Sequence, residues 1–129
     1  MMNVEDELTT AAATGNISHV QFLLSNGVNA NVVNKFRRTP IQVMMMGNAP
    51  LALVLLEQGA DPNVPDPDTG STPLHDAART GFIDTVRLLI RFGADPNTKD
   101  HCDLRPVDVA QQTGNVDVVE LLNRALKQL

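Results

Sequence analysis

Six glycines of this chain recur at a nearly constant interval, and that interval restricts the possible fold more than any other feature. Gly27, Gly59 and Gly93 each close an apolar run and are separated by 32 and 34 residues. Each follows another glycine by 12 residues, namely Gly15, Gly47 and Gly81. A period of about 33 residues indicates a stacked array, in which each repeat buries its apolar face against its neighbours.

The clearest repeat spans residues 70–100. Its Thr72-Pro73 pair predicts the start of a short first helix, because proline is tolerated at the first helical position. Gly81 then permits a tight turn, and Gly93 suits the left-handed residue after a second helix, where a hairpin-like loop begins. The second helix is predicted from an apolar stripe at helical spacing: Ile83, Val86, Leu89 and Ile90.

The outer repeats are looser copies of this unit. The first is predicted to begin at Leu8, and the acidic residues 1–7, which have no hydrophobic partner, are expected to fray. The fourth begins at His101. Its second helix is expected to continue toward Lys127, since no glycine closes it, and to bury three residues on the common stripe: Val116, Val119 and Leu122.

The second repeat lacks one residue. Thr39 to Gly47 is a step of 8 residues, whereas Thr72 to Gly81 is a step of 9. Residues 41–46 are therefore expected to form a single turn or a 3₁₀ segment. Met44 and Met45 leave two interpretations open, because unbranched methionines can fill an irregular gap or offer an adaptable binding surface.

One loop position predicts an unusual backbone conformation. Arg37 lies two residues before a Thr-Pro pair, at the position that Gly70 occupies in the third repeat. If that position requires a positive φ, Arg37 is strained by about 1–2 kcal/mol. Asp103 fills the same position in the fourth repeat at lower cost, because aspartate tolerates the left-handed region better.

Composition excludes several functional classes. The net charge of −5 disfavours nucleic-acid binding, which depends on Lys and Arg contacts to phosphates. The only aromatic residues are four phenylalanines, so an aliphatic, all-α core is expected. The single cysteine, Cys102, excludes an intramolecular disulfide, and the N-terminus lacks the pattern of a signal peptide. No apolar run approaches the ~20 residues that cross a bilayer, so an intracellular chain is expected.

The residues that could carry chemistry do not form a catalytic or metal-binding pattern. Ser71, His75 and Asp76 are near neighbours in sequence without a nucleophile elbow, so we expect no enzyme activity. His75 is instead expected to brace a loop through a hydrogen bond, in a position that Gln42 and Asp108 occupy in the adjacent repeats. Zinc ligand spacing and a phosphate-binding glycine loop are both lacking, so no cofactor is expected.

Charge is segregated along the chain. From Thr39 to Ala78 the sequence contains no Lys or Arg and five acids: Glu57, Asp61, Asp66, Asp68 and Asp76. Such an acidic sector is either a solvated surface or a site for a basic partner. Phe82 occupies a position that is Asn16, Asn48 and Asn115 in the other repeats, so its ring is either a local packing residue or a partner contact, and contact is favoured.

These motifs resemble a known family. The run TPLHDAA, followed by RLLI and GADPN, is similar to the ankyrin repeat, and the resemblance covers nearly the whole chain. The segments PIQVMMMG, HDAARTGF and LRPVDVA further resemble the INK-type inhibitors of cyclin D-dependent kinases. The resemblance implies a single-domain, all-α ankyrin-repeat solenoid over residues 1–129, with four helix-turn-helix repeats at about 5–34, 35–67, 68–100 and 101–129.

The resemblance also implies a function. A member of this family would bind a monomeric cyclin D-dependent kinase beside its ATP cleft, disfavour cyclin binding and restrain G1 progression, in the cytoplasm and nucleus and as a monomer when free. The contacts would come from the middle repeats, with Asp76 reaching a kinase arginine. The predicted contact residues are Asp76, Phe82, Asp66, Met44, Met45, Asp61 and Arg79. A generic ankyrin adaptor for another intracellular protein is the alternative.

Overall fold

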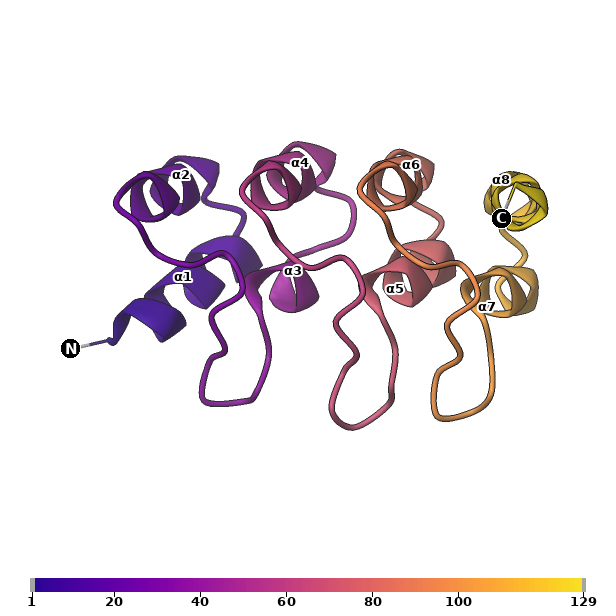
Figure 1. The fold of residues 1–129 in the computed structure, drawn as a ribbon, viewed down its shortest axis with the longest axis horizontal. Helices are drawn as coiled ribbons and strands as arrows, with labels where there is room; N and C mark the ends of the chain where they lie inside the picture. The colour runs from indigo at the N-terminus through magenta and orange to yellow at the C-terminus, as the bar shows by residue number, and fades with distance from the viewer. Residues whose placement is uncertain (1, 129) are drawn as a thin grey trace. The chain divides into compact units, whose positions relative to one another are not determined.

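The computed structural model describes residues 2–128, which form eight helices and no strand (Figure 1). The chain divides into two compact units, one ending at Asp61 and one beginning at Pro62. The first unit contains α1 (Val4–Ala13), α2 (Ile17–Ser25), α3 (Pro40–Val43) and α4 (Ala49–Glu57). The second contains α5 (Pro73–Thr80), α6 (Ile83–Arg91), α7 (Pro106–Gln112) and α8 (Val116–Lys127).

Each unit consists of two helix-turn-helix pairs. In the second unit, α5 packs beside α7 in one layer and α6 beside α8 in the other, and the loop from α6 to α7 projects on the side of α5 and α7 (Figure 1). The first unit repeats this arrangement, with α1 beside α3 and α2 beside α4. The all-α ankyrin-type fold is thereby confirmed. The single-domain organisation and the four repeat boundaries stay predictions.

The second unit has an aliphatic core that includes alanines. Leu74, Ala77 and Ala78 of α5 and Val86 and Leu89 of α6 are all fully buried. The aliphatic core expected from the composition is thereby present, and the small alanines leave room for close packing against α5. In the first unit the corresponding residues of α1, Ala11 and Ala12, are also buried.

The predicted turns and caps are largely confirmed. Thr72 caps α5 with Pro73 at the first helical position, and Gly81 and Gly93 have positive φ angles of 79° and 95°. Arg37, with φ at 66°, and Asp103, with φ at 64°, are the non-glycine residues of the described chain with positive φ. In the loop of the first unit, Asn34 N–H donates to the Arg38 carbonyl at 2.9 Å, which closes the hairpin-like tip around Arg37.

The shortened second repeat also folds as predicted. Helix α3 is a single turn of four residues that ends at Val43, and the backbone of the next residue, Met44, is extended. Its capping interaction is retained, because the Gln42 Oε1 atom accepts a hydrogen bond from the Thr39 backbone N–H at 2.7 Å. One missing residue therefore costs this helix its second turn but preserves its start.

Two predictions about the outer repeats are wrong. Residues 4–7, which were expected to fray, form the first turn of α1, because the Asn3 side chain accepts a hydrogen bond from Asp6 N–H at 2.8 Å and caps this acidic segment. Of the expected frayed segment, residue 1 lies outside the described residues. Of the three residues predicted on the buried stripe of α8, Leu122 is fully buried, Val119 is half-buried and Val116 is 76% exposed, and Val118 is the second fully buried residue of the helix.

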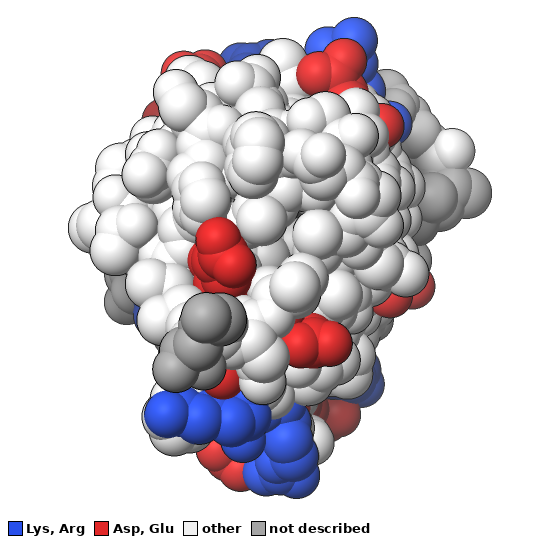
Figure 2. All heavy atoms as spheres, turned by 90° about the vertical axis from the view of Figure 1, so that its left-hand side faces the viewer, with Lys and Arg blue, Asp and Glu red and all other residues white. Residues whose placement is uncertain are grey.

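Figure 2 views the structure from the side of its N-terminal end. Most of this face is uncharged, with separate carboxylates, and Lys and Arg atoms are visible at both its lower and its upper edge. In the first unit the loop between α2 and α3 carries Lys35, Arg37 and Arg38, and the Lys35 ammonium lies 5.3 Å from the centre of the Phe36 ring.

Candidate protein-interaction site

His75 anchors the helix that presents the candidate site. Its side chain is fully buried, and Nδ1 accepts a hydrogen bond from the Thr72 backbone N–H at 3.1 Å. Because Nδ1 is an acceptor, Nε2 carries the proton and donates to the Leu104 carbonyl at 2.8 Å. The predicted loop-bracing role of His75 is confirmed, and α5 is held to the loop that precedes α7.

Asp76 follows His75 and lies at the surface of α5. Its Oδ1 atom is 2.8 Å from Nη1 of Arg79, one helical turn later, and Nη2 of Arg79 donates to the Ser71 hydroxyl at 2.9 Å. The Asp76 and Arg79 side chains are 33% and 43% exposed. The three side chains of Ser71, Asp76 and Arg79 are therefore already linked to one another at a solvent-accessible surface. The Asp76 carboxylate can accept a further hydrogen bond from a cationic group of a partner.

Phe82 stands at the turn between α5 and α6. It is the residue before α6, where its ring provides no capping hydrogen bond, and it is 46% exposed. In the first unit, Asn16 and Asn48 occupy this position and accept hydrogen bonds from His19 N–H and Leu51 N–H. Loss of such a cap costs about 1 kcal/mol, so Phe82 does not stabilise the start of α6 as a capping asparagine would.

The predicted acidic contacts differ in their local roles. In the second unit, the Asp66 carboxylate accepts hydrogen bonds from Asp68 N–H at 2.8 Å and Thr69 N–H at 3.2 Å, which shape the loop before α5. In the first unit, Asp61 is exposed, and its backbone N–H donates to the Asn31 side chain at 2.7 Å. A single acidic surface that includes both residues stays a prediction.

The methionines of the first unit separate into two environments. Met44 and Met46 are 4% and 7% exposed, whereas Met45 is 74% exposed. The packing interpretation therefore applies to Met44, which is buried and is not available as a surface contact. Met45 keeps the possibility of an adaptable contact.

An asparagine clamp that was not predicted from the sequence occurs in both units. In the second unit, the Asn63 amide donates to the Gly93 carbonyl at 3.0 Å, and its oxygen accepts from Asp95 N–H at 2.7 Å. In the first unit, Asn31 makes the same two bonds to the Gly59 carbonyl and Asp61 N–H. The signal was present, because Asn31 and Asn63 occur at the repeat interval.

Among residues 2–128, no group of three or more His, Cys, Asp or Glu side chains is placed to hold a metal ion. Within the same residues, no helix combines the length and the apolar character that a membrane span requires.

Comparison with known proteins identifies the family. The model of ankyrin repeats in three copies matches residues 8–100 and 44–127. Cyclin-dependent kinase inhibitor 2A of Monodelphis domestica is 49% identical over 122 residues, which cover 95% of this chain and 71% of that protein. Cyclin-dependent kinase 4 inhibitor B of Rattus norvegicus is 48% identical over 118 residues, covering 92% of this chain and 91% of that protein.

The human cyclin-dependent kinase 4 inhibitor B is 46% identical over 121 residues, which cover 94% of this chain and 88% of that protein. The chain therefore belongs to the ankyrin-repeat family and, within it, to the family of these cyclin-dependent kinase inhibitors.

Proposed function

We propose that this chain is a non-enzymatic inhibitor of a cyclin D-dependent kinase and acts by binding the kinase directly. Family membership supports kinase inhibition, since the relatives are named for it. The structural observation that carries the proposal is the Asp76–Arg79 pair on α5, which is solvent-accessible and held in place by Ser71. A preorganised surface pair binds a charged partner without the entropy cost of ordering its side chains.

The proposed contact surface in the second unit consists of Asp76, Arg79, Phe82 and Asp66. The first three belong to α5 and the turn after it, where Phe82 adds an exposed apolar ring. In the first unit, Met45 and Asp61 are the proposed contacts, and the buried Met44 is left out. Charged residues would set orientation and association rate, while the exposed ring and methionine would supply apolar area.

The inhibitor would act by selecting a kinase state. If it binds beside the ATP cleft and favours a misaligned arrangement of the kinase lobes, cyclin binding and activation are disfavoured by the same coupling free energy. Such an activity restrains G1 progression and requires the protein to meet the kinase in the cytoplasm or nucleus.

Substitution of Asp76 tests this proposal. Asp76→Asn should change the free energy of unfolding by no more than about 0.5 kcal/mol, because the ion pair with Arg79 is exposed. If the carboxylate pairs with a kinase arginine, the same change should weaken kinase binding by ~2 kcal/mol or more, about 30-fold. Binding is measured by calorimetry with purified kinase, and stability by urea denaturation.

Asp76→Lys should abolish inhibition, whereas the matched reversal Asp95→Lys should leave inhibition nearly unchanged, because Asp95 lies in the loop after α6. An Asp76→Lys protein that inhibits the kinase as well as the unmodified chain would refute the proposed contact. The adaptor alternative would be favoured if the unmodified chain also failed to bind any cyclin D-dependent kinase.

A further inference from the structure

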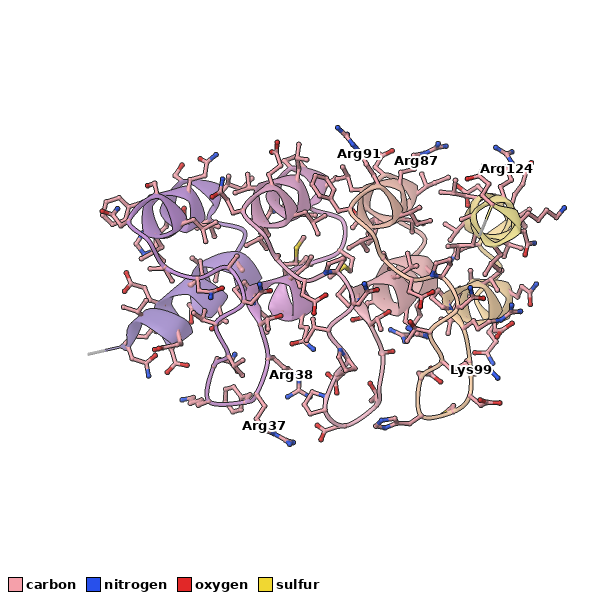
Figure 3. The ribbon with its side chains drawn as sticks, viewed as in Figure 1. Arg37, Arg38, Arg87, Arg91, Lys99 and Arg124 are labelled. Atoms are coloured by element: carbon pink, nitrogen blue, oxygen red, sulfur yellow. The ribbon has the colours of Figure 1, made fainter. Side chains whose placement is uncertain are left out.

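Three arginines line a groove between α6 and α8 of the second unit. Arg87, Arg91 and Arg124 project from these helices on the side away from α5, α7 and the loop tips (Figure 3). The groove has a volume of about 310 Å³, and its apolar lining includes Ile90, Leu121 and Ala125. An apolar floor with a cationic rim is thereby exposed on a chain whose net charge is −5.

The repeat fold does not require these cations. Helix α2 has Gln21 and Ser25 at the positions equivalent to Arg87 and Arg91, and α4 has Leu53 and Glu57 there. Two like charges one helical turn apart destabilise a helix by a few tenths of a kcal/mol. The arginines of α6 therefore need an explanation outside the stability of the helix.

Local interactions do not neutralise the groove. Among the described residues, Arg87 has no hydrogen bond or ion pair, and the Arg91 guanidinium lies 5.8 Å from the centre of the Phe92 ring. Arg124 pairs with Glu120 at 2.8 Å, but both side chains are about two-thirds exposed. An exposed pair of this kind is worth little and exchanges readily for a partner's carboxylate.

The first unit contains an internal comparison. The equivalent groove between α2 and α4 has a volume of about 590 Å³, and none of its lining residues is Lys or Arg. It is lined by uncharged residues, including Gln21, Phe22 and Val54, and by Glu57. The groove is thus a consequence of helix stacking, whereas its positive charge is particular to α6 and α8.

We propose that the α6–α8 groove binds an acidic peptide segment of another protein. Carboxylates of the segment would contact Arg87 and Arg91, and an apolar side chain would cover the floor at Leu121. A phosphate backbone or an anionic membrane is less suitable, because such extended polyanions would also meet the acids of this negatively charged chain. The groove is formed by different helices from the Asp76–Arg79 pair, so this binding would be separate from kinase inhibition.

The test uses the full chain and a fluorescein-labelled peptide of about 12 residues, composed of Glu and Leu with the leucines on one helical face. A matched peptide with Gln in place of every Glu is the ligand control. Fluorescence polarisation at low ionic strength should show saturable binding of the Glu peptide, weakened by salt because the contacts are exposed charges. Amide shifts in NMR should change at Ile90, Leu121 and Ala125.

The double variant Arg87→Glu/Arg91→Glu should weaken binding of the Glu peptide by at least ~10-fold, with kinase inhibition unchanged. The variant Arg87→Gln/Arg91→Ser introduces the residues that α2 has at these positions and should also weaken binding of the Glu peptide. It keeps the test valid if the charge-reversed protein does not fold. Lys99→Glu, an exposed reversal in the loop after α6, should change binding less than about 2-fold.

Unchanged affinity in both double variants would overturn the proposal, as would equal binding of the Gln peptide. Tighter binding of a single-stranded oligonucleotide or of phosphatidylserine vesicles at the same arginines would overturn it in favour of a polyanion site.

Discussion

Leu89 is the residue for which the structure gives the sharpest stability prediction. Its side chain is fully buried, with 0% of its surface exposed to solvent. It belongs to α6, which packs against both α5 and α8. Truncation to alanine loses about 2.4 kcal/mol of transfer free energy, at about 0.8 kcal/mol for each buried carbon. The cavity left between stacked helices adds to this, so Leu89→Ala should destabilise the protein by about 2–5 kcal/mol.

Because the chain contains no Trp or Tyr, unfolding is best followed by far-UV circular dichroism in urea. A loss of this size should lower Tm by about 10 °C or more in a chain of this length. Since a repeat array gains stability from each interface, the variant can also unfold in two steps, and the transition should be tested for a single midpoint.

Val116→Ala is the matched control. Its position was predicted on the same buried stripe, but the side chain is 76% exposed, so the change should cost less than about 0.5 kcal/mol. A loss below about 1 kcal/mol for Leu89→Ala, or equal losses for the two variants, would refute the assignment of the buried stripe.

Three further substitutions test individual loop and cap interactions. Arg37→Gly relieves a φ of 66° and should be neutral or stabilising by up to ~1 kcal/mol in urea denaturation; a clear loss would mean that the arginine side chain's own contacts outweigh the strain. Asn63→Ala removes both bonds of the clamp in the second unit and should cost about 1–2 kcal/mol, whereas Asn97→Ala, in the following loop, should cost less than about 0.5 kcal/mol. The hydrogen bond from Arg105 N–H, followed by the Arg105 charge, lowers the pKa of Asp108 below its usual 3.8. Because the folded-state pKa is the lower one, this carboxylate contributes stability above pH 3.8 that is lost as pH falls through the folded value, and Asp108→Asn should flatten that part of the stability profile.

The local elements of the fold were predictable because their signals are short in sequence. Thr-Pro pairs, glycines and a 3.6-residue period specify where helices begin, end and face. The same reasoning located the positive φ of Arg37 and the single turn of α3, since both follow from comparing one repeat with the next.

The errors arose where a repeat has a different environment. Val116 was assigned by its match to Ile83, but Ile83 itself is only half-buried, so this position of the repeat is not a core position. The start of α1 was missed because a cap is set by a single side chain, Asn3, and not by an apolar pattern.

The site was predicted only in part. Asp76 and Arg79 were both named, and their spacing of three residues on a helix is sufficient to predict the pair. The contact of Arg79 with Ser71 was not predictable in the same way, because it joins the helix to the residue before its N-cap across eight positions. The distinction between Met44 and Met45 required three-dimensional packing, since the two residues are chemically identical.

Asp76 and Asp108 show how fold and function can be separated within one repeat pattern. Asp108 occupies the position of His75, where a side-chain acceptor closes the start of α7, so the fold itself uses this carboxylate. Asp76 lies one position later in α5, where α7 has Val109, which is only 4% exposed. The repeat can therefore bury an apolar residue at that position, and a carboxylate there gives up apolar burial for one exposed ion pair. That exchange offers folding only an exposed ion pair and a carboxylate in the first turn of α5. We therefore expect substitution of Asp76 to change mainly kinase binding, whereas substitution of Asp108 should change mainly stability.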